Sequence, residues 1–228
     1  MAARREPYHL AGFVSIPFLL LILVDGFWKP ALLRGPFIAY WSFDFAKWIL
    51  LPILLLAILH RRSDVVGADY GLAAPLGMAD LVYIFPLPFF SLFFADLVAV
   101  QVSARLLGYP QPYFDLEKAL AALGPLWIVG TIYTAATAAF WESVFFIGLP
   151  WLWFSRTRAV SQRERLAFTL LTAGLFALAH WENGAPNSIG AFIFQCIAVW
   201  WFLRLRTLWP VVAAHFAVDV IYFWPRVT

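Results

Sequence analysis

Four ionisable side chains lie inside apolar stretches in the C-terminal half of this chain. They are Glu142 in Phe-Trp-Glu-Ser-Val-Phe-Phe, His180 in Phe-Ala-Leu-Ala-His, and His215 with Asp219 in His-Phe-Ala-Val-Asp. A carboxylate near the centre of a bilayer costs about 2.5–3.5 kcal/mol on insertion scales, so such groups usually face a protein interior and carry function. Two carboxyl groups and two imidazoles are suited to activating a water molecule. The pattern indicates an intramembrane hydrolase.

The residue types suggest a division of labour. Glu142 in a poorly hydrated cavity suits a general base acting on water, and His180 suits a group that holds and orients that water. His215 can donate a hydrogen bond to the oxygen of a tetrahedral intermediate. Asp219 lies four residues after His215, on the same helical face, and can fix the tautomer of His215 or, if protonated, donate to the oxyanion itself. Both roles of Asp219 remain open.

Composition assigns the chain to the polytopic membrane proteins. Of its 228 residues, 63% are hydrophobic and only 13% are charged, whereas soluble domains have roughly 45–50% apolar and about 25% charged residues. The expected fold is an all-α membrane bundle forming a single domain over 1–228, with the catalytic motifs in 121–224. The net charge of +3 gives little support for a nucleic-acid partner.

Apolar runs long enough to cross a bilayer, roughly 20 residues each, set the number of helices. Seven spans are predicted, at 9–28, 37–59, 80–106, 121–154, 166–182, 187–203 and 208–224. The count becomes eight if 121–154 splits. Prolines mark candidate breaks in the two long spans: Pro86 and Pro88 in one, Pro125 and Pro150 at the edges of the other. The first run has no cleavage site after it and is interpreted as an uncleaved helix.

Loop charge predicts the orientation. With the N-terminus inside, ten of the sixteen basic residues fall on the cytoplasmic face, five fall on the opposite face, and Lys47 stays inside a span. The positive-inside rule therefore favours a cytoplasmic N-terminus.

Several other polar residues have simpler interpretations. Asp44 and Lys47, three apart within the second span, are expected to form an ion pair. Asp25 is expected near a helix end, where water can solvate it. Glu182 is two residues beyond His180 and points off that helical face, so it is expected in a loop. The segment from Gly108 predicts a turn and a short interfacial helix with Asp115 as its N-cap.

The ordered motifs resemble the CAAX protease and bacteriocin-processing enzyme family of intramembrane glutamic endopeptidases. The resemblance rests on Glu142-Ser-Val-Phe-Phe-Ile-Gly, Phe176-x-x-x-His180 and His215-x-x-x-Asp219, and the segment from Trp201 to His215 is typical of bacterial members. It covers about the last ninety residues. It implies that the chain hydrolyses a peptide bond in a membrane-tethered protein or peptide, at a CAAX-type tail or in C-terminal or leader processing. It also implies a bacterial inner (plasma) membrane location.

By this resemblance, Glu142 and His180 activate the water while His215 and Asp219 form the oxyanion site, where the family accepts Asn or Asp. Two positions depart from the family. Its first motif has a second Glu and a later Arg before the glycine, and this chain has Ser143 and Ile147 there. Any substrate contact made by those two charged groups is missing here.

Two alternatives stay open at this stage. Glu142, His180, His215 and Asp219 could bind zinc, since imidazole nitrogens and carboxylate oxygens are zinc ligands, although no His-Glu-x-x-His motif is present. The leading interpretation needs no cofactor. A non-enzymatic role in bacteriocin immunity, transport or scaffolding is the third reading, because intramembrane His and Asp also form proton relays. The absence of internal repeats and of paired broken helices argues against transport.

Overall fold

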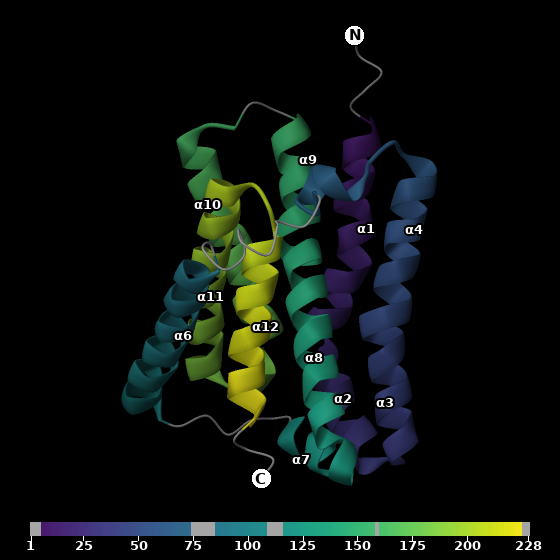
Figure 1. Cartoon of the computed structure of the whole chain (residues 1–228), viewed down its shortest axis with the longest axis vertical. Helices are drawn as coiled ribbons and strands as arrows, with labels where there is room; N and C mark the ends of the chain where they lie inside the picture. The colour runs from purple at the N-terminus through teal and green to yellow at the C-terminus, as the bar shows by residue number, and fades with distance from the viewer. Residues whose placement is uncertain (1–5, 74–84, 109–115, 158–159, 225–228) are drawn as a thin grey trace.

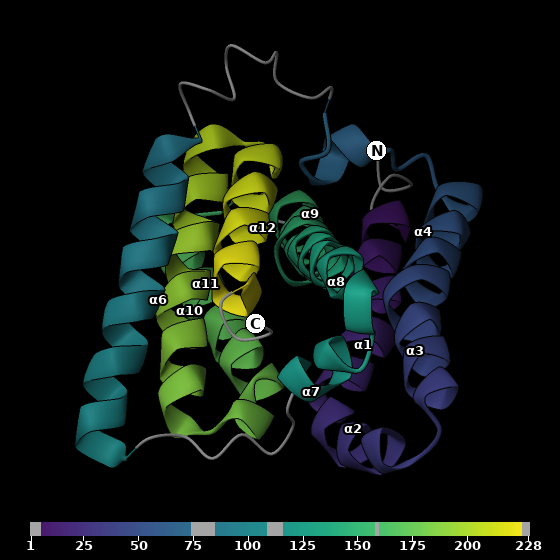
Figure 2. The ribbon, with the colours of Figure 1, turned by 60° about the horizontal axis from the view of Figure 1, so that its bottom comes forward.

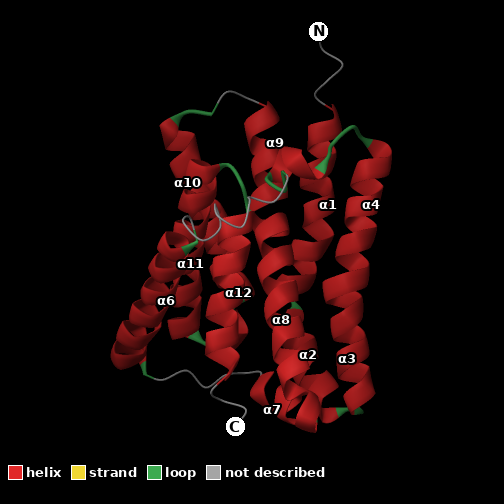
Figure 3. Cartoon of the chain, in the orientation of Figure 1, coloured by secondary structure: helices red, strands yellow, loops and turns green. Residues whose placement is uncertain are grey.

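The computed structural model describes residues 6–73, 85–108, 116–157 and 160–224, and within them the chain is helical without a strand (Figure 3). The α-helices are α1 (Glu6–Leu23), α2 (Asp25–Arg34), α3 (Phe37–Phe45), α4 (Leu51–Arg62), α6 (Pro86–Leu107), α7 (Leu116–Ala121), α8 (Trp127–Glu142), α9 (Leu149–Thr157), α10 (Gln162–Ala179), α11 (Ala185–Leu205) and α12 (Trp209–Phe223). Two π-helical segments, η1 (Ala46–Leu50) and η4 (Ser143–Gly148), and three 3-10 turns, η2 (Gly67–Tyr70), η3 (Gly124–Leu126) and η5 (Trp181–Asn183), join them.

The continuous rod formed by α8, η4 and α9 lies between two groups of helices (Figures 1 and 2). On one side α1 packs against α9 and against α4. On the other side α12 packs against α8, and α11 packs against both α6 and α10. Glu142 ends α8 in the middle of this rod, so the rod places it between the two groups.

All seven predicted spans contain helix, which confirms a helical membrane bundle. In the part of the chain that the structure describes, four helices are long and apolar enough to cross a membrane, or five if the bent pair Tyr8–Leu23 and Asp25–Leu32 counts as one span. Of the remaining two, α12 has only 15 residues and α10 begins with Arg163, Glu164 and Arg165. The count of seven crossings therefore stays a prediction. Residues 80–84 and Asp115 lie outside the described residues.

The fourth span does not split, because one helical rod runs from Gly124 to Ser155. Pro150 has no N–H for the carbonyl four residues earlier, and the chain passes it through η4, where the Leu149 N–H bonds to Val144 five residues back. The same device precedes Pro52, where the Leu51 N–H bonds to Ala46 at the end of η1. In both places a π-helical segment ends two residues before a proline. Neither π-helical segment was predicted from the sequence.

The first predicted span, 9–28, is not one straight helix. The chain bends by 50° between α1 and α2, at Val24. The prediction of a single helix there is wrong, because Asp25 and the glycine after it begin a second helix that turns beneath the bundle (Figure 2).

Helix ends gather on two opposite faces of the bundle. The starts of α1, α10 and α12 and the ends of α4, α9 and α11 lie on one face (Figure 1). That face receives Arg61 and Arg62 from the last turn of α4. Large apolar side chains such as Phe13, Ile38 and Leu171 are exposed on the outside of the bundle, as a membrane-embedded surface requires.

Candidate active site

Three of the four predicted site residues meet between α8 and α12. Nε2 of His215 lies 3.7 Å from Oε2 of Glu142 and 3.5 Å from Oδ2 of Asp219. Glu142 and His215 are each 7% exposed. The four-residue spacing puts His215 and Asp219 on the face of α12 that packs against α8, so two helices far apart in the sequence bring two carboxylates to one imidazole.

These separations exceed the 2.7–3.2 Å of an ordinary hydrogen bond. The His215 imidazole therefore interacts electrostatically with the two carboxylates without forming a direct hydrogen bond to either. Catalytic hydrogen bonds are often long before a substrate binds and tighten in the complex. The arrangement can accept a small polar group, such as a water molecule or a carbonyl oxygen, next to both carboxylates.

His180 lies beside this trio. Its ring packs on Phe176 with centroids 4.4 Å apart, and Phe176 contacts the His215 ring edge-on at 6.4 Å. Nδ1 of His180 lies 2.8 Å from the carbonyl oxygen of Phe176. Because a carbonyl only accepts, Nδ1 carries the proton, and the neutral ring presents Nε2 as an acceptor. The Phe176-x-x-x-His180 motif therefore fixes the tautomer of the histidine.

The two positions that depart from the family motif are part of the core. The Ser143 hydroxyl donates to the carbonyl of Ala139 at 2.7 Å, and Ile147 is 1% exposed.

Gly148 is required by close packing, because a Cβ atom there would lie 2.5 Å from the backbone oxygen of Tyr70. Burial, with the nearby Asp69 carboxylate, raises the pKa of Tyr70 to about 12, and its hydroxyl lies 3.1 Å from Nε2 of His60. The close approach of Gly148 to Tyr70 and the contact of Tyr70 with His60 together hold η2 on the bundle.

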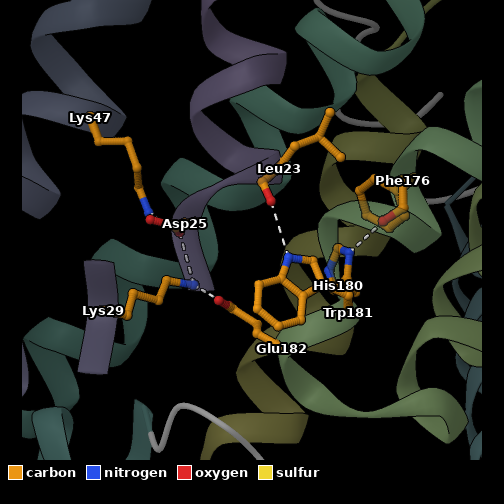
Figure 4. A network of polar contacts seen from close by, with 8 residues as sticks. All are labelled: Leu23, Asp25, Lys29, Lys47, Phe176, His180, Trp181 and Glu182. Carbon is orange, nitrogen blue, oxygen red and sulfur yellow. Dashed lines mark hydrogen bonds and ion pairs between the residues drawn. The ribbon is translucent and has the colours of Figure 1, made fainter. Parts of the chain in front are cut away.

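A buried ionic network that was not predicted from the sequence lies next to His180 (Figure 4). Lys47 does not pair with Asp44 as expected; its Nζ lies 2.6 Å from Oδ2 of Asp25. Asp25 is 2% exposed, so the expectation of a solvated helix end is also wrong. Glu182 lies in the turn η5 between two helices, as expected, but it is buried and forms an ion pair with Lys29. The four-residue spacing of Asp25 and Lys29 was the available signal.

The described residues contain no group of three or more His, Cys, Asp and Glu side chains arranged to hold a metal ion. Zinc binding at the four site residues stays an alternative that metal analysis can test.

Comparison with known proteins gives one family. Residues 124–221 match the family model described as type II CAAX prenyl endopeptidase Rce1-like. Searches of curated proteins and of solved structures each found no significant match. The matched region spans α8 to α12 and contains all four predicted site residues, and the match confirms the resemblance predicted from the motifs. Residues 124–221 of this integral membrane protein are therefore similar to the Rce1-like CAAX protease family.

Proposed function

We propose that the chain is an intramembrane endopeptidase in which Glu142 is the general base that activates water. The observation that carries the proposal is the approach of Glu142 Oε2 to within 3.7 Å of His215 Nε2, with Asp219 Oδ2 at 3.5 Å from the same nitrogen. The match of residues 124–221 to the CAAX protease family model supports the reaction class, which is hydrolysis of a peptide bond in a membrane-associated protein.

The proposed reaction needs one water molecule and no covalent enzyme intermediate. The Glu142 carboxylate takes a proton from the water while the water oxygen attacks the scissile carbonyl carbon. The tetrahedral oxyanion accepts a hydrogen bond from His215 or from a protonated Asp219. Collapse breaks the C–N bond, and Glu142 returns its proton to the leaving amine. General-base catalysis contributes about 10²–10⁴-fold, and one oxyanion donor about 10²–10³-fold.

His180 has a supporting role in this proposal. With Nδ1 held by the Phe176 carbonyl, Nε2 can accept a hydrogen bond from the attacking water and orient one of its lone pairs. Ser143 and Ile147 are engaged in the core. The substrate is therefore recognised without a second glutamate or an arginine at these positions.

Cleavage of a quenched fluorescent peptide in proteoliposomes tests the proposal. The probe is a farnesylated peptide with a CAAX-type tail, with its unprenylated form measured in parallel. Glu142→Gln keeps the size of the side chain and removes the base, so we expect cleavage to fall by about 10²–10⁴-fold. Glu164→Gln is the matched control, because Glu164 is the capping residue at the start of α10 and glutamine also serves in a capping box.

Two results would contradict the proposal. One is a folded Glu142→Gln protein that cleaves as fast as Glu164→Gln. The other is a folded natural chain that cleaves neither form of the probe.

A further inference from the structure

A chain of buried charges links the N-terminal helices to the turn that follows His180. Asp25 contacts two lysines: Lys47 Nζ at 2.6 Å and Lys29 Nζ at 2.9 Å. Lys29 also forms an ion pair with Glu182 in η5. Figure 4 shows the path from Lys47 through Asp25 and Lys29 to Glu182, with His180 two residues before Glu182. Two acidic and two basic side chains leave the chain of charges with no net charge.

A second contact joins the same two regions. The bend at Val24 changes the helical hydrogen bonding: the Phe27 N–H, which would reach the carbonyl of Leu23 in a regular helix, donates to Val24 instead. The indole N–H of Trp181 donates to the Leu23 carbonyl at 3.0 Å. The bend in the N-terminal helix thus provides an acceptor for the residue next to His180.

Close packing completes this attachment. Gly26 is buried against η5, and a Cβ atom there would lie 2.7 Å from the Trp181 ring and 2.9 Å from both Cβ and Oε2 of Glu182. Only glycine allows α2 to approach the turn this closely. The turn is also bonded to His180 itself: the Asn183 N–H donates to the carbonyl of His180 at 3.0 Å. A shift of the turn therefore moves the backbone of His180.

We propose that Lys29 is a positioning residue for His180: its ion pairs with Asp25 and Glu182 hold the Trp181–Asn183 turn against the N-terminal helices and so fix the histidine beside the catalytic trio. This inference rests on the proposed function. It assigns a role in the reaction to helices outside the family-matched region 124–221. An active site needs its groups placed within a fraction of an ångström, and an error of about 1 Å can cost about 100-fold in rate.

Lys29→Met tests the role of the charge, because methionine keeps most of the side-chain length. We expect kcat on the farnesylated probe to fall about 10–100-fold with little change in KM, since substrate binding is not altered. Lys29→Arg should restore most of the activity because it keeps a cation. Arg34→Met is the control, because Arg34 is exposed at the end of the same helix.

The double variant Lys29→Met/Glu182→Gln separates positioning from charge balance. It removes one positive and one negative charge and leaves the Asp25–Lys47 pair in place. Positioning predicts that kcat stays low, because the tether is missing. A role in charge balance alone predicts recovery to the natural kcat, and that recovery would overturn the proposal.

Hydrogen exchange of the amides of residues 180–184 gives a readout independent of activity. In Lys29→Met we expect these amides to exchange at least about tenfold faster, through local opening, with the amides of α11 unchanged. If Lys29→Met does not fold, Trp181→Phe removes only the indole donor and should speed the same exchange. Unchanged exchange of these amides in the folded variants would contradict the proposal, whatever the value of kcat.

The two proposals fail differently. Retained activity in Glu142→Gln contradicts the catalytic role of Glu142, whereas unchanged exchange at 180–184 contradicts only the positioning role of Lys29.

Discussion

Gly26→Ala should disturb the turn after His180 although residue 26 lies in a different helix. The added Cβ would sit 2.7 Å from the Trp181 ring and 2.9 Å from the Glu182 side chain. Carbon atoms pack at about 3.5–4.0 Å, so the turn must retreat by about 1 Å or α2 must move away. Overpacking of this kind costs about 1–3 kcal/mol.

Gly174→Ala is the matched control. Gly174 lies within α10, and a Cβ atom there meets nothing within 4 Å. Replacing glycine by alanine inside a helix gains up to about 1 kcal/mol. The free energies of unfolding of the two variants should therefore differ by about 1–4 kcal/mol, with Gly26→Ala the less stable.

Thermal unfolding in detergent and peptide cleavage in proteoliposomes measure the two effects. We expect a lower melting temperature for Gly26→Ala than for Gly174→Ala. Displacing the turn by about 1 Å should also lower kcat about 10–100-fold in Gly26→Ala, with kcat of Gly174→Ala near that of the natural chain. A Gly26→Ala protein as stable and as active as Gly174→Ala would refute the close approach of α2 to the turn.

Two further predictions concern the glycine of the first motif and the metal alternative. Gly148→Ala should lower the melting temperature more than Gly26→Ala does, because the added Cβ would lie 2.5 Å from the backbone oxygen of Tyr70. Backbone yields less readily than a side chain, so the cost in unfolding free energy is about 3 kcal/mol or more. A melting temperature equal to that of Gly174→Ala would contradict this prediction. Protein that has been treated with a chelator and shown by metal analysis to be metal-free should cleave the farnesylated probe at an unchanged rate. If cleavage is lost on chelation and added zinc restores it, the zinc alternative replaces the glutamate mechanism.

The helices could be predicted from the sequence because the length of an apolar run fixes where a chain can be helical in a membrane. The bend at Val24 could not be predicted, because the stretch from Leu10 to Val24 is almost uniformly apolar. The two π-helical segments were also missed. Pro52 and Pro150 predict an interrupted hydrogen-bond ladder, but whether a proline breaks a helix or is passed by a π turn depends on the packing around it.

The approach of Glu142 to His215 could be predicted only by assuming that the two residues share a catalytic role. Spacing along the chain sets contacts within one helix and not between helices. The spacing of His215 and Asp219 did predict their shared face. Ion pairing shows the limit of local spacing: Lys47 has Asp44 three residues away and yet pairs with Asp25, in the preceding predicted span. The burial of Glu182 was not predicted because its partner, Lys29, lies in the N-terminal region, where the motifs give no guidance.

The position of an uncleaved substrate tests the central claim most directly. The measurement is an experimental structure of the Glu142→Gln variant with the farnesylated probe peptide bound in a membrane mimetic. We expect the scissile carbonyl carbon to lie beside residue 142, with its oxygen within hydrogen-bond distance, about 2.7–3.2 Å, of His215 or Asp219. A peptide bond held on another part of the bundle, out of reach of all three side chains, would contradict it.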